Sequence, residues 1–303
     1  MAAKPEVLKP FLANPKNVVV GYHAGCNDGF GAALVFWYLF GDTATYKPLR
    51  YQEEFNAEEY RGKALLLVDF SFSRAQLLAL KEVTTHLLVL DHHETAEANL
   101  AGLDNCYFGK GVSGAVMAFE LARSLLTQVP YSTLHFLVDY IQDRDLWTWS
   151  LESSREVNAA LVLWPRGKFE IWDERLRSYT SEELYMRLRT EGHILLQQTE
   201  GLVRMAAASA RFCVFEGLAA VEVNSCLFYS ELGEHLGGRA SVVLVWSVQR
   251  DGRYRYELRT STEGVHVGEL AKKYGGGGHK QAAGFVVGQR LELPTVSAKV
   301  PLA

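Results

Sequence analysis

Apolar positions in the first half of the chain form short continuous runs that alternate with longer helical patterns. The runs "NVVVGYH" (17–23), "ALLLVDF" (64–70) and "HLLVLDHH" (86–93) are rich in Val and Leu, as is typical of parallel strands covered on both faces. Between them, "DGFGAALVFWYLFG" and "SRAQLLALKEV" have an apolar spacing suited to helices. This order predicts an α/β fold with a doubly wound, mainly parallel sheet.

The second half contains a long helical pattern, "SEELYMRLRTEGHILLQQTEGLVRMAAAS", which we interpret as an interdomain connector. Farther on, "RYRYELRTS" alternates with a period of two, which indicates a half-buried strand. In the first half, Ser113 is a candidate N-cap for a helix. The 303 residues, 48% of them hydrophobic, are enough for two modest globular domains.

Possible metal ligands stand at the carboxyl end of each predicted strand. They are His23 with Asp28, then Asp69, then Asp91 with His92 and His93. In an open parallel sheet the carboxyl ends of the strands share one edge, where loops form the binding crevice. We therefore expect three distant segments to converge there. A fourth group, Asp143 or Asp145, would reach the same edge from the end of the helical stretch "STLHFLVDYIQDRDLWTW".

Carboxylates gathered in one crevice repel one another unless cations neutralise them, and a pair of divalent ions turns that repulsion into coordination. Imidazole together with carboxylate suits manganese, iron, cobalt or zinc better than calcium. Two such ions clamp phosphoryl oxygens and lower the pKa of a bridging water. Phosphoester hydrolysis is therefore the expected chemistry.

Each segment taken alone also has a purely structural explanation. The histidine pair of "DHH" fits a solvated turn, and Asp69 could cap a helix that begins near Ser73. Asp143 and Asp145 could belong to a turn at a helix end. Their joint occurrence beside successive strand ends favours the metal site.

A second signal is the segment "YGGGGHKQAAGF" (274–285). Consecutive glycines let the backbone approach a ligand closely and present N–H groups to an anion, with His279 at the edge of that turn. Arg259 ends the strand in "RYRYELRTS", and we expect it to face the glycines and to bind a phosphate through two hydrogen bonds. A flexible linker is the alternative, but the apolar segments on both sides favour a ligand-binding turn.

Composition limits the kinds of ligand and the cellular compartment that we expect. A net charge of −4 differs from that of a bulk nucleic-acid binder, so an anionic ligand must be held locally. The four cysteines form no C-x-x-C pair, which argues against a zinc ribbon or a disulfide framework and fits a reducing cytoplasm. The sequence has no run of about 18 uncharged apolar residues, so we expect no membrane span. The first residues have no apolar stretch typical of a secretion signal.

Taken together, segments 23–29, 66–71 and 90–94 and the glycine-histidine run resemble the DHH phosphoesterase superfamily with its C-terminal DHH-associated substrate-binding domain. The resemblance extends from about residue 17 to about residue 287. It implies a metal-binding catalytic domain over 1–175, a helical connector over 176–208 and a smaller α/β DHH-associated domain over 209–303.

The resemblance also implies roles for individual residues. The metal ligands would be His23, Asp28, Asp69 as the bridge between two ions, His92, and Asp143 with Asp145 as its rival. Asp91 would orient the site and His93 would face the scissile phosphate. Gly276, Gly277, Gly278, His279 and Arg259 would hold the far phosphate and sugar of a nucleotide.

Cys26 is a departure from the family pattern. The common first motif has two aspartates, whereas "HAGCNDG" has Cys26 in place of the first and one residue fewer after His23. A thiolate ligand would favour softer ions such as iron, cobalt or zinc. A small buried thiol in a tight turn is the alternative.

The expected activity is two-metal hydrolysis of short oligonucleotides or dinucleotides to mononucleotides. Mn²⁺ is the expected cofactor, with Co²⁺, Fe²⁺, Zn²⁺ or Mg²⁺ as alternatives. Two other functions stay open: a phosphatase of small anions such as polyphosphate, pyrophosphate or a nucleoside bisphosphate, and a catalytically idle nucleotide-binding module.

Overall fold

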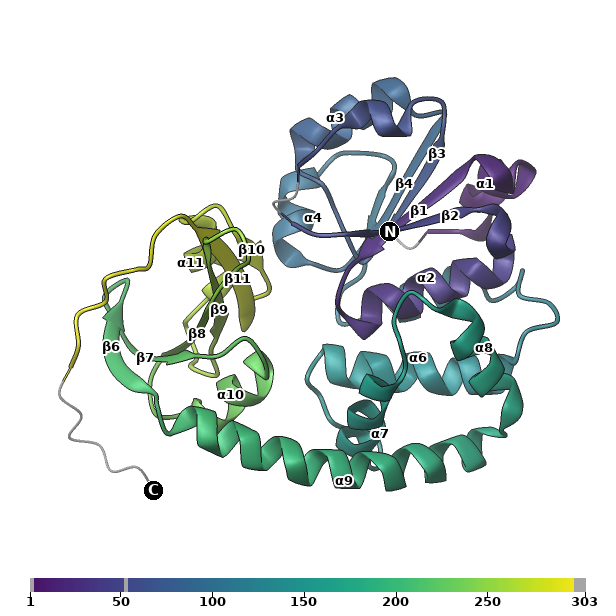
Figure 1. Cartoon of the computed structure of the whole chain (residues 1–303). Helices are drawn as coiled ribbons and strands as arrows, with labels where there is room; N and C mark the ends of the chain where they lie inside the picture. Colours follow the sequence, from purple (N-terminus) through teal and green to yellow (C-terminus); the bar gives the residue numbers. More distant parts are fainter. Residues whose placement is uncertain (1–2, 52–53, 297–303) are drawn as a thin grey trace. The chain divides into compact units, whose positions relative to one another are not determined.

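The computed structural model describes residues 3–51 and 54–296 (Figure 1). The chain forms two compact units, Met1–Leu196 and Gln197–Ala303. Their division falls within the helix α9 (Ser181–Ala207), which corresponds to the long helical pattern of the sequence. The predicted domain boundaries after residues 175 and 208 stay predictions.

The first unit is built on a five-stranded sheet. Its strands are β1 (Val18–His23), β2 (Thr45–Leu49), β3 (Ala64–Val68), β4 (His86–Asp91) and β5 (Cys106–Phe108). They lie in the order β2-β1-β3-β4-β5, and every neighbouring pair is parallel. The three strands expected from the sequence are confirmed as the central ones, whereas the two edge strands were not predicted.

Helices cover both faces of this sheet (Figure 1). In chain order they are α1 (Lys9–Ala13), α2 (Asn27–Phe40), α3 (Arg74–Val83), α4 (Glu94–Leu100), α5 (Gly114–Ala122), α6 (Tyr131–Asp145), α7 (Ser154–Ala160) and α8 (Phe169–Ser178). Short 3-10 turns occur at Pro5–Leu8, Pro15–Asn17, Gly41–Thr43, Ala57–Tyr60 and Leu161–Leu163. Ser113 accepts a hydrogen bond from the Val116 N–H and caps α5, as predicted.

Alternate side chains of the strands point to two separate cores. Val20, Leu66 and Leu90 pack on the side of α2, α5 and α6. Leu65 and Val89 pack on the opposite side, with residues of α3 and α4. Strands buried on both faces explain the unbroken Val and Leu runs, and the doubly wound α/β fold is confirmed.

The strand order places β1 and β3 side by side, with the chain leaving them toward opposite edges of the sheet. Such a switch point opens a crevice at the carboxyl ends of the strands. His23 ends β1 and Asp69 directly follows β3. The sheet order therefore brings these two residues to the place where a ligand site is expected.

The second unit has a six-stranded mixed sheet. Its strands are β6 (Arg211–Phe215), β7 (Leu218–Asn224), β8 (Val242–Val248), β9 (Tyr254–Arg259), β10 (Gly277–Gly278) and β11 (Ala282–Val287), in the order β10-β11-β9-β8-β7-β6. β7 and β8 run parallel, and the other neighbouring pairs are antiparallel. The helix α10 (Tyr229–Leu236) packs on one face, and α11 (Val267–Lys272) packs on the other. Among the described helices, none is both long enough and apolar enough to cross a bilayer.

Candidate metal centre

Asp69 lies at the centre of the site. Its backbone φ of 52° is in the left-handed region, which Asp tolerates better than most residues. Its buried carboxylate places Oδ1 3.1 Å from Nε2 of His92 and Oδ2 3.4 Å from Nδ1 of His23. Asp69 does not cap α3, because Ser73 does so through a capping box with Gln76.

Two triads of potential ligand atoms share the Asp69 carboxylate. His23, Asp69 and His93 form one triad, and Asp28, Asp69 and His92 form the other. Within each triad the ligand atoms lie within 4.8 Å of one another. The side chains that the sequence places at the ends of β1, β3 and β4 are therefore brought together.

Asp28, in the first turn of α2, is held by the start of α5. Its two carboxylate oxygens accept hydrogen bonds from the N–H groups of Gly114 (2.7 Å) and Ala115 (2.8 Å). A Cβ on Gly114 would lie 2.6 Å from Cβ of Asp69, so only glycine permits this approach. Oδ2 of Asp28 is 3.4 Å from Nε2 of His92, which places the carboxylate in the second triad.

The two candidates for the fourth acidic ligand have different surroundings. Oδ2 of Asp145 lies 3.5 Å from Nε2 of His92. The carboxylate of Asp143 instead accepts hydrogen bonds from Thr148, Ser150 and the Leu151 N–H, on the loop that follows α6. The geometry favours Asp145 over the first choice, Asp143, because Asp143 is occupied with holding its own loop.

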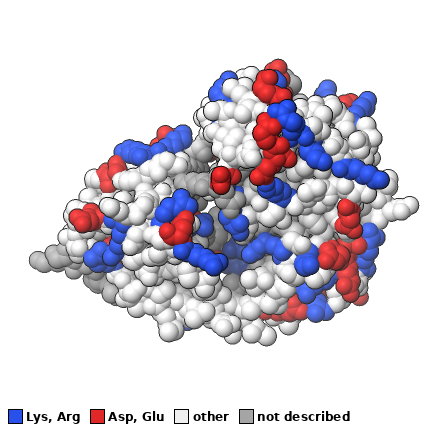
Figure 2. Space-filling model, turned by 45° about the horizontal axis from the view of Figure 1, so that its top comes forward, with Lys and Arg blue, Asp and Glu red and all other residues white. Residues whose placement is uncertain are grey.

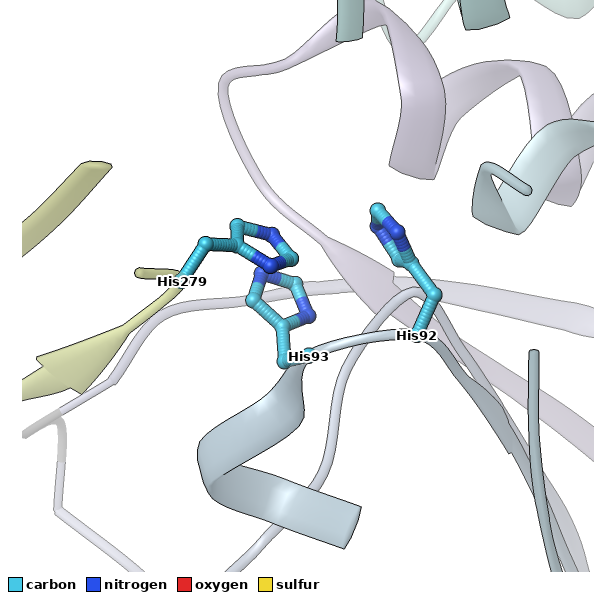
Figure 3. Close-up of side chains that lie close together, drawn as sticks. All are labelled: His92, His93 and His279. Carbon is cyan, nitrogen blue, oxygen red and sulfur yellow. The ribbon is translucent and has the colours of Figure 1, made fainter. Parts of the chain in front are cut away.

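Asp91 holds the histidine pair in place. Its Oδ1 accepts hydrogen bonds from the backbone N–H of His92 (2.7 Å) and from Nδ1 of His93 (2.7 Å), and Oδ2 accepts one from the hydroxyl of Ser71 (2.5 Å). Figure 3 shows the two neighbouring imidazoles projecting from the segment between β4 and α4. The sequence did not single out Ser71, although it stands two residues after Asp69.

Cys26 lies inside the cluster. Its Sγ is 3.3 Å from Oδ2 of Asp69 and 3.6 Å from Nδ1 of His23, and it accepts a hydrogen bond from the Gly29 N–H as the N-cap of α2. Burial and the carboxylates of Asp69 and Asp28 raise the pKa of the thiol well above its usual value. A bound cation would offset both effects and favour the thiolate.

The carboxylates govern the protonation of the histidines. Burial alone would lower the pKa of His92, but hydrogen bonding to Asp69 and the charge of Asp28 raise it to about 10. Burial likewise opposes protonation of His93, yet Asp91 raises its pKa to about 9. The carboxylates thus draw positive charge into the site, and a divalent cation can supply that charge beside His92 once it displaces the proton of this imidazole.

Comparison with known proteins places this geometry in a family. The DHHA1 domain family matches residues 228–300. The chain is similar to oligoribonuclease NrnB of Bacillus subtilis strain 168, with 22% identity over 281 residues that cover 85% of this chain and 70% of that protein. These matches support the predicted DHH phosphoesterase superfamily member with a C-terminal DHHA1 domain. The predicted enzyme class, a divalent-metal-dependent phosphoesterase, agrees with them.

The chain is also similar to the uncharacterized protein R106 of Acanthamoeba polyphaga mimivirus, with 26% identity over 292 residues that cover 88% of this chain and 66% of that protein. It therefore spans about two thirds of the length of these two relatives.

Two solved structures show the same fold as this chain. An exopolyphosphatase-related protein from Bacteroides fragilis aligns with a TM-score of 0.52 and 13% identity, over 95% of this chain and 92% of that one. RecJ from Thermus thermophilus, in complex with Mn²⁺, aligns with a TM-score of 0.51 and 19% identity, over 93% and 52% of the two chains.

In the part of the chain that matches the DHHA1 domain, the glycine run forms a tight hairpin. Gly277 and Gly278 pair with β11, and the His279 N–H donates to the Ala282 carbonyl (2.8 Å). A Cβ on Gly276 would lie 2.1 Å from the Gly284 carbonyl oxygen, so close strand packing requires glycine here.

Arg259 lies at the same end of this sheet, since its Cα pairs with that of Ala282 in β11. Its guanidinium contacts Glu257 Oε2 (3.2 Å) and the Ser230 hydroxyl, and its aliphatic stem packs on Gly233 of α10. The side chain therefore lies on the α10 side of the sheet and not, as expected, toward the glycines.

Proposed function

We propose that this chain is a divalent-metal-dependent phosphodiesterase that hydrolyses short oligonucleotides or dinucleotides to mononucleotides. The sharing of Asp69 between two triads carries the proposal, because one carboxylate that directs its two oxygens to different imidazoles suits a pair of neighbouring ions. Similarity to an oligoribonuclease and the fold of a manganese-bound RecJ support the same activity.

The proposed ligands are His23, Cys26, Asp28, Asp69, His92 and Asp145. Their closest separations, 3.1 to 3.6 Å, fit this role. Metal–ligand bonds of about 2.0–2.3 Å at tetrahedral angles place ligand atoms roughly 3.3–3.8 Å apart. When bound, two divalent ions would supply an activated water and bind phosphoryl oxygens. We propose Mn²⁺, with Co²⁺, Fe²⁺, Zn²⁺ and Mg²⁺ as alternatives.

His93 is the proposed group that meets the substrate phosphate. Its Nδ1 is bound to the fully buried Asp91, which fixes the plane of the ring and favours the protonated form. The other ring nitrogen of such an imidazolium can donate a hydrogen bond to the negative charge that develops on a phosphate oxygen. Asp91 therefore acts as a positioning residue.

The proposed substrate is short. Figure 2 shows Lys and Arg side chains interspersed with Asp and Glu side chains on the face in view, as expected for a net charge of −4. A long polynucleotide usually needs an extended basic channel. We propose that the glycine hairpin and His279 of the DHHA1 domain bind the far phosphate and sugar, and that Arg259 reaches this ligand from the α10 side of the same sheet end.

We also propose that the protein acts in a reducing compartment such as the cytoplasm. All four cysteines lie in the described part of the chain, and all four are free thiols. Structural disulfides are rare where thiols are kept reduced.

Replacing His93 by Ala is expected to lower kcat for manganese-dependent hydrolysis of a dinucleotide by roughly 100-fold to 1000-fold. The loss follows from removal of the donor to the charged phosphate. Turnover is measured as mononucleotide release by chromatography, and manganese content is measured by elemental analysis. His86→Ala, at the other end of β4, is the matched control.

The same assay separates the competing functions. Faster release of phosphate from pyrophosphate or polyphosphate than of mononucleotides from a dinucleotide would identify a small-anion phosphatase. If the wild type binds the dinucleotide but, like His93→Ala, does not hydrolyse it, then the protein is a catalytically idle binding module. Either result contradicts the proposed function.

Cobalt is expected to report directly on Cys26. Protein loaded with Co²⁺ should show a sulfur-to-cobalt charge-transfer band in the near ultraviolet, because a thiolate ligand donates strongly to this ion. Cys26→Ser should lose the band, and Cys106→Ser should keep it. If the band is absent from wild-type protein that has bound cobalt, then Cys26 is only a partly buried helix cap.

A further inference from the structure

Tyr51 is a solvent-exposed aromatic ring beside the candidate metal centre. It follows β2, the strand next to β1, and the residue is 46% exposed. The ring centroid lies 5.5 Å from that of His23 and 6.2 Å from that of His93, with interplanar angles of 61° and 77°. Two imidazoles of the proposed centre thus border the ring of Tyr51.

The ring of Tyr51 is supported from below by buried aromatic residues. It stacks on Phe70 with centroids 4.6 Å apart and an interplanar angle of 24°. Phe70 is 1% exposed and contacts Phe72 edge-on at 5.1 Å, and Phe72 in turn contacts Phe55. One face of the tyrosine ring is therefore fixed against the core, while nearly half of the residue stays in contact with solvent.

This arrangement has the features of a base-stacking platform. A large exposed aromatic ring is costly to leave in water and, when held rigidly, binds a planar partner with little loss of conformational entropy. Stacking of a nucleobase on an aromatic side chain contributes about 1–3 kcal/mol and accepts any base. An inorganic phosphate chain would gain nothing from such a ring.

We propose that Tyr51 stacks against the nucleobase attached to the phosphodiester that the metal centre cleaves. The inference rests on the proposed function and names its substrate class: a base-bearing phosphodiester and not an inorganic polyphosphate. Only one sugar separates a base from its phosphate. A base stacked on Tyr51 would therefore place its phosphate close to His23 and His93. Phe70 acts as the positioning residue for the platform.

The test compares two substrates with and without a base. Tyr51→Ala is expected to lower kcat/KM for a dinucleotide by about 10-fold to 100-fold, mostly through KM, because stacking binds ground state and transition state alike. The same variant should cleave an abasic phosphodiester analogue at the wild-type rate. Tyr51→Trp should restore the dinucleotide activity, since stacking needs only an aromatic ring.

Tyr131→Ala is the matched control, because Tyr131 is 42% exposed and packs on a buried phenylalanine, Phe119, at the start of α6. It should leave kcat/KM for both substrates unchanged. Equal losses by Tyr51→Ala on the dinucleotide and on the abasic analogue would overturn the inference, since they would reveal a structural role.

Equilibrium binding keeps this inference separate from the proposed function. A dinucleotide titrated into the calcium-loaded protein should bind roughly 10-fold more weakly to Tyr51→Ala than to the wild type. If the wild type hydrolyses no phosphodiester, the proposed function fails, yet this difference in Kd would still support stacking. Equal Kd values would overturn the stacking role whether or not the protein is active.

Discussion

An Asp69→Asn variant is expected to lose about 1000-fold or more in kcat toward a dinucleotide, the largest effect of any single substitution in the site. Both oxygens of the carboxylate face imidazoles of different triads, so the substitution weakens both proposed ion positions at once. Asparagine has the same shape and also tolerates the left-handed backbone that this position requires. The loss should therefore come from chemistry and not from misfolding.

Elemental analysis, thermal unfolding and turnover together check this expectation. The variant should bind less than the wild-type content of manganese. Its metal-free form should still unfold cooperatively, but at a somewhat lower temperature than the metal-free wild type. Burial alone would raise the pKa of Asp69, yet hydrogen bonds from His23 and His92 hold it well below its usual value, so the carboxylate stabilises the fold. Asp139→Asn changes a half-exposed aspartate of α6 that lies outside the site, and it is the matched control. An Asp69→Asn protein that keeps both its manganese and its activity would disprove the bridging role.

Asp145→Asn and Asp143→Asn are expected to fail in opposite ways. Asp145 lies next to His92, so its substitution should reduce kcat by roughly 100-fold or more with little change in the free energy of unfolding. Asp143 accepts hydrogen bonds from Thr148, Ser150 and Leu151, so its substitution should cost about 1–3 kcal/mol of that free energy.

The stability of the protein at acidic pH should reveal the structural role of Asp143. Burial alone would raise the pKa of Asp143, but hydrogen bonds from Ser154, Thr148 and Ser150 hold it well below its usual value. A carboxyl group with a lowered pKa in the folded state stabilises the protein above its unfolded-state pKa, and this contribution is lost as the pH falls through the folded-state value. The wild type should therefore lose this contribution in that acidic range, and its free energy of unfolding should approach that of Asp143→Asn.

Urea denaturation and initial rates, measured on both variants, separate the two roles. Full activity in Asp145→Asn, combined with loss of activity in a stably folded Asp143→Asn, would return the ligand role to Asp143. The result decides between two carboxylates that stand only two residues apart.

The sequence predicted the parts of the fold that depend on apolar burial. The Val and Leu runs of β1, β3 and β4 are central strands because both of their faces are covered. β2 escaped prediction because its sequence TYKPL is half-exposed and contains a proline, which an edge strand tolerates. β5 has only three residues, too few for a periodic signal.

The site was predictable where a ligand directly follows a strand, as Asp69 follows β3. The choice between Asp143 and Asp145 was not predictable from the sequence. Both residues lie at the end of the same helix, and only the path of the next loop decides which carboxylate binds that loop and which one faces His92. Tyr51 also escaped notice, since an isolated tyrosine after an unpredicted edge strand has no pattern. Its significance comes from the packing of Phe70 beneath it.

The hydrogen bonds from the start of α5 to Asp28 tie the metal centre to the packing of a helix that carries none of the proposed ligands. Two backbone N–H groups at the positive end of the helix dipole hold this carboxylate, and Gly114 lets the helix start approach Asp69 closely. A substitution that shifts the start of α5 would therefore disturb the centre without replacing any ligand.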